Sequence, residues 1–210
     1  MSATERSEAS DSSRVSEDSE MPIVAGVAAG LVAWLGGYVF TYVVAADEIR
    51  NSGLNRIVEA LSGDAATYEI VGWVFYNAHF VDTVFQNLPI VGSVTANYVG
   101  GEDGFTAALY AIPIALLCLG GAATAAYTHA ADATSGIRAG VVLVPGYLVA
   151  TVAGVFLFEV TTGSATAGPD QLAAIVLAGI VYPVVFGSIG GAAVGWYLGR
   201  QRNQNSTTNQ

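Results

Sequence analysis

The sequence predicts an all-α protein: a helical membrane bundle with four transmembrane helices and an external region of amphipathic or interfacial helices. Three observations support this fold class. The 210 residues are 53% hydrophobic and only 11% charged, whereas soluble domains carry about 25% charged residues. Four apolar runs lack acidic and basic side chains, and each reaches the roughly 20 residues that a spanning helix needs. Two of these runs also end in nearly the same residues.

The four spans and the segments around them divide the chain into three parts. Residues 1–20 hold six acidic side chains and two arginines but little apolar surface, so a disordered, acidic cytoplasmic tail is predicted. Residues 21–200 form the bundle, and residues 201–210 form a polar tail. The predicted spans are residues 22–46, 105–128, 139–158 and 172–198.

The charge balance narrows the range of partners. Seven basic residues, all of them arginine, stand against seventeen acidic ones, which gives a net charge of -10. Such a balance repels nucleic acid and anionic lipid headgroups, so neither is expected to bind. An acidic chain without lysine is typical of salt-loving archaea, where the Debye length falls to about 3 Å in molar salt. The alternative is a mesophilic protein with an acidic tail.

The external region, residues 47–103, separates the first two spans. Asp47–Leu61 has the spacing of an amphipathic helix. The aromatic segment Glu69–Gln86 is predicted to be a helix that lies in the membrane interface, with a fifth span as the alternative. Residues 87–104, which contain Pro89 and a Gly-Gly pair, are predicted to be a loop.

Arginines set the orientation, because cytoplasmic loops are enriched in basic residues. Arg138, Arg200 and Arg202 flank the third and fourth spans, which predicts a cytoplasmic C-terminus. Four spans also bring the N-terminus inside, and five spans would move it outside. Four spans fit the hydropathy better, and five fit the positions of Arg50 and Arg56 slightly better.

The repeated pattern relates the second and fourth spans. Pro113-Ile-Ala-Leu-Leu-Cys-Leu-Gly-Gly-Ala-Ala-Thr-Ala-Ala-Tyr127 aligns without a gap with Pro183-Val-Val-Phe-Gly-Ser-Ile-Gly-Gly-Ala-Ala-Val-Gly-Trp-Tyr197. The match favours a duplicated hairpin whose halves run in the same direction, with a path for solutes possible along the axis between them. Convergence of two small-residue helices is the alternative.

Small residues and prolines mark positions of close packing and of bending within the spans. Glycines let neighbouring backbones approach, within one chain or at a homo-oligomer seam or another membrane subunit. Prolines remove a backbone hydrogen bond and bend the helix. Such a bend can serve as a hinge, or it can be a static kink with no functional motion. The glycines are Gly26, Gly30, Gly121, Gly187, Gly191, Gly195 and Gly199, and the prolines are Pro113, Pro145 and Pro183.

The candidate functional residues are Tyr76, Asn77, His79 and Asp82, which form a polar face if Glu69–Gln86 is helical. A polar surface of an interfacial helix is the simpler interpretation of that face. His79 and Asp82 at i, i+3 are too few for a metal site, and a single Cys118 supplies no metal-binding cysteine pair. No catalytic or nucleotide-binding motif is present. We therefore expect no enzyme activity, metal or cofactor.

The run Val71-Gly72-Trp73-Val74-Phe75-Tyr76-Asn77-Ala78-His79-Phe80-Val81-Asp82, placed after Val24-Ala25-Gly26-Val27-Ala28-Ala29-Gly30, resembles a family of uncharacterised multi-pass membrane proteins of halophilic archaea. The resemblance implies a membrane location and a salt-loving host, and it assigns no site. Two functions remain open. One is a small passive channel or carrier, or a subunit of one, which predicts a stable oligomer or a polar cavity lined by Thr124, Thr151, Ser188 and the proline-kinked backbone. The other is a non-transporting scaffold or sensor whose external region docks a partner.

Overall fold

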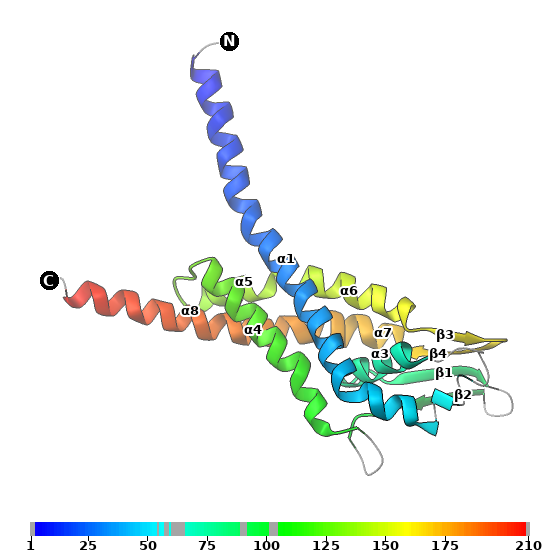
Figure 1. Ribbon diagram of the computed structural model, residues 1–210. Helices are drawn as coiled ribbons and strands as arrows, with labels where there is room; N and C mark the ends of the chain where they lie inside the picture. The colour runs from blue at the N-terminus through cyan, green and yellow to red at the C-terminus, as the bar shows by residue number, and fades with distance from the viewer. Residues whose placement is uncertain are drawn as a thin grey trace.

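The computed structural model describes residues 3–53, 55–56, 59, 66–88, 92–100 and 105–208, with side chains from residue 23 to residue 204 within these ranges. A helical bundle carries a small antiparallel sheet at one end, and both chain termini lie away from that sheet (Figure 1). We call these two ends the sheet end and the terminal end. The helices are α1 (Ala3–Asn51), α3 (Thr67–Asn77), η1 (Ala107–Tyr110), α4 (Ala111–Tyr127), α5 (Ala133–Val141), α6 (Val144–Leu157), α7 (Gln171–Ala173), η2 (Ala174–Val181) and α8 (Tyr182–Thr208).

Four stretches of helix are long and apolar enough to cross a membrane, as the four apolar runs predict. They are Ile23–Asn51, Ala107–Tyr127, Ala133–Leu157 and Gln171–Gln204. Successive stretches alternate in direction between the two ends of the bundle (Figure 1). α1 begins at Ala3, so it includes most of the segment for which a disordered tail was predicted. A helix satisfies its backbone hydrogen bonds locally, and this part of α1 projects away from the other helices (Figure 1).

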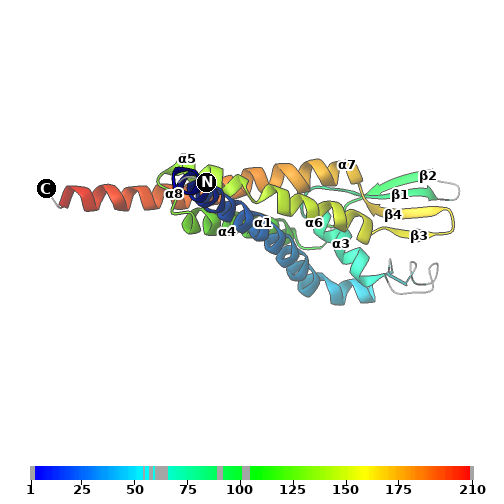
Figure 2. The same ribbon diagram turned by 90° about the horizontal axis from the view of Figure 1, so that it is seen from above.

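The fold is not all-α, because the sheet end carries four strands in the order β2-β1-β4-β3. They are β1 (Thr83–Leu88), β2 (Gly92–Ala96), β3 (Val160–Thr162) and β4 (Ala165–Pro169). β1 pairs with β2 next to it in the chain and with β4, about 80 residues further on. The sheet extends beyond the ends of the helices (Figure 2). The loop predicted over residues 87–104 is therefore wrong at residues 87–88, which end β1, and at Gly92–Ala96, which form β2.

The helix predicted over Glu69–Gln86 is also wrong in both extent and place. α3 ends at Asn77, the chain turns over residues 78–80, and β1 starts at Thr83. Every residue of α3 from Ile70 to Asn77 is buried, so α3 lies inside the protein rather than in an interface. An all-round apolar helix needs such enclosure. With 11 residues it is about 16 Å long, which is too short for a fifth span of about 30 Å.

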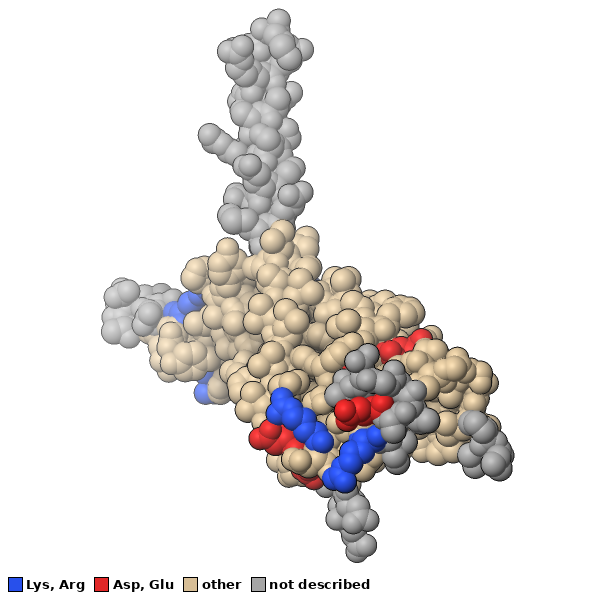
Figure 3. Space-filling view, turned by 45° about the vertical axis from the view of Figure 1, so that its right-hand side comes forward, with Lys and Arg blue, Asp and Glu red and all other residues tan. Residues whose placement is uncertain are grey.

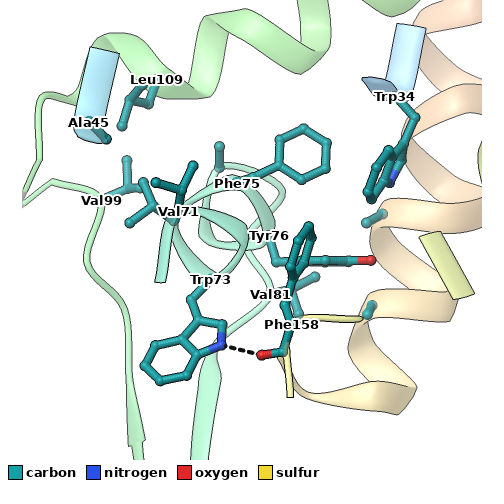
Figure 4. Close-up of a cluster of buried hydrophobic side chains, with 14 of the residues drawn as sticks. Trp34, Ala45, Val71, Trp73, Phe75, Tyr76, Val81, Val99, Leu109 and Phe158 are labelled. Carbon is teal, nitrogen blue, oxygen red and sulfur yellow. Dashed lines mark hydrogen bonds between the residues drawn. The ribbon is translucent and has the colours of Figure 1, made fainter. Parts of the chain in front are cut away.

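Aromatic packing holds α3 among the long helices. Trp34 of α1 meets the Phe75 ring edge-on at 5.2 Å between centroids and stacks on Phe158 at 6.2 Å. The Trp73 indole N–H donates a 2.7 Å hydrogen bond to the Phe158 carbonyl oxygen (Figure 4). The amphipathic helix predicted for 47–61 continues α1 as far as Asn51, and part of the remainder lies outside the described residues.

The prolines coincide with changes of helix type. Pro145 is the second residue of α6, which follows a break at Val142 and Leu143 in the third membrane-length stretch. Pro183 is the second residue of α8, and α8 directly follows the π-helix η2. Pro113 lies in the first turn of α4, after η1, where a missing N–H costs little. Two of the four long stretches are thus irregular at their prolines.

The predicted packing glycines face other helices of the same chain. A Cβ on Gly191 or Gly195 of α8 would lie within 3.0 Å of backbone in or next to α5, and Gly121 of α4 meets Gly187 in the same way. A Cβ on Gly199 would lie 2.7 Å from the Ala131 carbonyl oxygen. Gly26 and Gly30 of α1 lie against the break between α5 and α6. These contacts let α4, α5 and α8 pack at backbone distance.

A methyl group at Gly191 should destabilise the protein, because its Cβ would lie within 3.0 Å of the Gly136 carbonyl and only a backbone shift can relieve this. We expect Gly191→Ala to lower the free energy of unfolding by about 1–3 kcal/mol. Gly36→Ala is the matched control, since its nearest atom is Leu116 Cδ1 at 3.7 Å, and the gain in helix propensity should raise stability by up to about 1 kcal/mol. Thermal unfolding in detergent measures both, and equal effects would contradict the assigned packing.

Candidate functional site

A cluster of buried polar side chains lies where α3 ends, between α6 and the junction of η2 with α8. We call it the His79 cluster. Its members share burial inside the bundle and hydrogen bonds that cross between elements. They are Tyr76, Asn77, His79, Tyr147, Thr151 and Tyr182.

The turn after α3 brings His79 into this position. Phe80 has a positive φ of 59°, which an aromatic residue rarely adopts, and its ring stacks on Tyr110 at 4.5 Å. The Asn77 side-chain amide N–H donates to the Val81 carbonyl at 2.7 Å, and its carbonyl oxygen accepts from the Tyr98 backbone N–H at 2.8 Å. Asn77 therefore joins the end of α3 to the strands that follow it.

His79 is fully buried and both of its ring nitrogens are paired. Nδ1 lies 2.8 Å from the Phe75 carbonyl oxygen, and Nε2 lies 2.6 Å from the Tyr147 hydroxyl. A carbonyl only accepts, so Nδ1 carries the proton, and in the neutral ring Nε2 then accepts from Tyr147. Burial lowers the pKa of His79 to about 4, so the imidazole is neutral at ordinary pH.

Tyrosines link the cluster to both irregular helices. The Tyr182 hydroxyl donates to the Ala78 carbonyl at 3.4 Å, and its ring lies 4.8 Å from the His79 ring. The Tyr76 hydroxyl donates to the carbonyl of Thr151 in α6. The Thr151 hydroxyl itself is buried and has no hydrogen-bond partner among the described residues. The cluster thus offers hydroxyl and imidazole groups without any net charge.

The polar helix face predicted from Tyr76, Asn77, His79 and Asp82 does not exist. The first three are buried, and Asp82 is exposed beyond the end of the helix, where it accepts a 3.0 Å hydrogen bond from the Asn97 amide. Among the described residues no group of three or more His, Cys, Asp or Glu side chains could hold a metal. Sequence reasoning missed Tyr147 and Tyr182, whose only signal is a phenol within an otherwise apolar run.

The described cavities lie at the two ends of the bundle. At the sheet end, one of about 170 Å³ is lined by residues of β1, β4 and α7 together with Glu159, just before β3, and Asp170, just before α7. At the terminal end, one of about 440 Å³ lies between α4 and α5 and is lined in part by Thr124. Thr151 and Ser188 line neither of these two. The polar cavity predicted to be lined by Thr124, Thr151 and Ser188 together is therefore not one of these two cavities.

Fold and site together define a class: a mostly helical protein with four helices of membrane-crossing length, a small sheet at one end and an uncharged polar cluster under a buried short helix. Over residues 4–198 the chain matches the model of a family of unknown function, DUF7978, and it belongs to that family. A search of curated proteins and one of solved structures found no match.

Acid should destabilise the protein through His79. Its pKa of about 4 in the folded state lies below the unfolded value of about 6.5. The neutral His79 therefore contributes to the free energy of unfolding in full above about pH 6.5. This contribution, up to about 3 kcal/mol, is lost as the pH falls toward 4. Thermal unfolding between pH 7.5 and 4.5 should therefore show a steeper loss for the wild type than for His79→Asn. His129→Asn, at an exposed histidine, is the control and should match the wild type. Equal acid sensitivity of the wild type and His79→Asn would contradict this assignment.

Proposed function

We propose that the protein is a multi-pass integral membrane protein, with its sheet end outside the cell and both termini in the cytoplasm. The observation that carries this proposal is a wide belt without charged side chains between two charged ends (Figure 3). A charge at the centre of a bilayer costs about 3 kcal/mol on insertion scales, so such a belt fits a protein that crosses the hydrocarbon layer.

The surface of the belt is also apolar. Large hydrophobic side chains project from α1, α6 and α8, for example Val43 at 75% exposure and Phe156 at 66%. In the most apolar part of the four long stretches, at most 44% of the residues are buried inside the protein. Water would solvate this surface poorly, and lipid chains would cover it.

The charge at the two ends supports the orientation. Where side chains are described, from residue 23 to residue 204, the terminal end has three arginines against one acidic side chain, Asp132. The sheet end has seven acidic side chains against two arginines. Basic residues favour the cytoplasmic side, and Arg200 lies over the exposed ring of Trp196 at 4.1 Å, an arrangement suited to a membrane interface.

For the activity, we propose a small passive channel or carrier, or a subunit of one, in a closed form with α3 as the plug. The break before α6 and the π-helix η2 both adjoin the His79 cluster, through Tyr147 and Tyr182. Irregular helices inside a membrane commonly line a substrate path, and π-helical turns often lie at functional sites. An uncharged cluster favours small neutral solutes that form hydrogen bonds.

The axis between α4 and α8 is not this path. Gly121 and Gly187 bring the two backbones together at that crossing, so a methyl group on Gly121 would overlap the Gly187 carbonyl. The route anticipated from the duplicated segments is therefore closed. Gly146 of α6 also lies at backbone distance from Val27 of α1, so a path beside α3 would form only if α3 moves. We assign no catalysis to the protein and propose a salt-loving host for it, in line with its acidic, lysine-free composition.

Single cysteines in a Cys118→Ala background test the membrane topology. Ser93→Cys in β2 and Thr134→Cys in α5 replace exposed side chains at opposite ends. An impermeant maleimide applied to intact cells should label position 93, and position 134 should react only after the membrane is opened. The reverse pattern would overturn the orientation. A protein recovered in the soluble fraction would overturn the membrane proposal itself.

Flux through reconstituted liposomes tests the proposed activity. Phe75 lies fully buried between α3 and α1, so Phe75→Ala should loosen the plug and raise glycerol permeability several-fold above the wild type. Phe156→Ala removes a ring that faces outward and should leave permeability unchanged. Light scattering after an osmotic step measures the rates, and thermal unfolding verifies that each variant is folded. Rates equal to those of empty liposomes for the wild type and Phe75→Ala would favour a non-transporting scaffold instead.

A further inference from the structure

The cavity at the terminal end lies between the last turns of α4, the connection after it, and α5. It measures about 440 Å³ and is lined by both apolar and polar residues, and we call its polar lining residues the rim. The lining includes Thr128, His129, Ser135, Arg138 and Val142. Neither the fold nor the proposed transport role makes use of this cavity.

The rim carries one cation and several hydrogen-bonding groups. Arg138 is exposed, and no carboxylate in the described part of the chain lies within salt-bridge distance of its guanidinium. Asp132 does not line the cavity, and its carboxylate accepts the Ser135 backbone N–H at 2.8 Å. This hydrogen bond and the nearby charge of Arg138 both lower the pKa of the Asp132 carboxyl. The Thr128 and Ser135 hydroxyls also belong to the rim, but Thr128 already donates to the Thr124 carbonyl and Ser135 to the Asp132 carbonyl. The donors available to a phosphate group are therefore those of the Arg138 guanidinium.

A second guanidinium lies next to the cavity. Arg202 of α8 donates a 2.8 Å hydrogen bond to the carbonyl of His129, one of the lining residues. Although the whole chain carries -10, the described side chains of the terminal end sum to about +2, three arginines against Asp132. The repulsion of anionic headgroups expected from total charge therefore does not apply here, and the acidic N-terminal segment belongs to the part of α1 that projects away (Figure 1).

An acyl chain would have an apolar surface to follow from this rim. Val142 lines the cavity one helical turn beyond Arg138, and Ile137 and Val141 on the same helix are exposed at 42% and 39%. Tyr127 at the end of α4, next to the lining residue Thr128, is exposed as well. A free phosphate would make no use of these surfaces, whereas a phospholipid would contact both the cation and the apolar wall.

We propose that this cavity binds the headgroup phosphate of an anionic phospholipid from the inner leaflet, with Arg138 as its principal cation. The proposal rests on the membrane orientation proposed above. Basic pockets between transmembrane helices on the cytoplasmic side are suited to anionic headgroups. Such a lipid would connect α4 to α5 across the turn that joins them.

Native mass spectrometry of the full chain in neutral detergent tests this site. We expect phosphatidylglycerol to be retained in preference to phosphatidylcholine with the same acyl chains. Arg138→Gln should weaken phosphatidylglycerol binding about five-fold, the effect of one arginine near a headgroup. Arg138→Lys should keep most of the binding, and Arg50→Gln at the sheet end is the control and should bind like the wild type.

Three results would overturn the proposal: equal retention of the two lipids, equal binding by Arg138→Gln and Arg50→Gln, or thermal stabilisation by inorganic phosphate that equals that by phosphatidylglycerol. The last result would assign the site to a free anion. Arg138 is exposed, so its replacement should leave the fold intact, and thermal unfolding verifies this. The cysteine-labelling pattern tests the membrane orientation separately, so failure of the lipid site and failure of the topology are distinguishable.

Discussion

Enclosure of α3 on all sides is the constraint on which the rest of the structure depends. A buried helix satisfies its internal hydrogen bonds but leaves unpaired backbone groups at its ends, and these ends need partners where water is absent. At the C-terminal end, His79, Asn77 and Tyr182 supply such partners: His79 bonds back to the Phe75 carbonyl, Tyr182 to the Ala78 carbonyl, and Asn77 to the Val81 carbonyl. The polar cluster is thus first a condition for burying α3 and only then a candidate site.

Room for α3 depends in turn on the close packing of the other helices. Glycines draw α4, α5 and α8 together at backbone distance in the terminal half of the bundle. Toward the sheet end the interior is instead filled by large aromatic side chains. Trp34 and Phe158 pack with Phe75 where α3 meets the long helices. Small residues at one end and aromatic rings at the other therefore give the bundle a tapered interior. In the membrane that we propose for this bundle, the hydrophobic effect contributes little to helix association, so shape complementarity of this kind would hold the helices together.

The sequence predicts well what depends on local composition. Four long helices follow from four uncharged apolar runs, and close contacts follow from glycines spaced four residues apart, such as Gly187 and Gly191. It fails where a distant partner decides the outcome. Thr83–Leu88 is a strand because β4, about 80 residues later in the sequence, pairs with it. The residues of the segment itself do not indicate that partner. In the same way, His79 Nε2 pairs with the hydroxyl of Tyr147, 68 residues later in the sequence. Helical spacing alone grouped His79 with Asp82 instead, because it considers only neighbours in the sequence.

The two halves of the chain are unequal where chemistry is concentrated. α4 and α8 run in the same general direction (Figure 1), as a duplicated hairpin requires. In the sheet, however, β1 and β4 are central and β2 and β3 lie at the edges. The first strand of one hairpin thus lies beside the second strand of the other at the centre of the sheet, which a twofold axis between the two hairpins does not produce. α3 and its turn exist only in the first half, yet their polar contacts reach Tyr147 and Tyr182 of the second. A twofold axis through the bundle therefore does not account for the His79 cluster. The cluster depends on α3 and the turn after it, which have no counterpart in the second half.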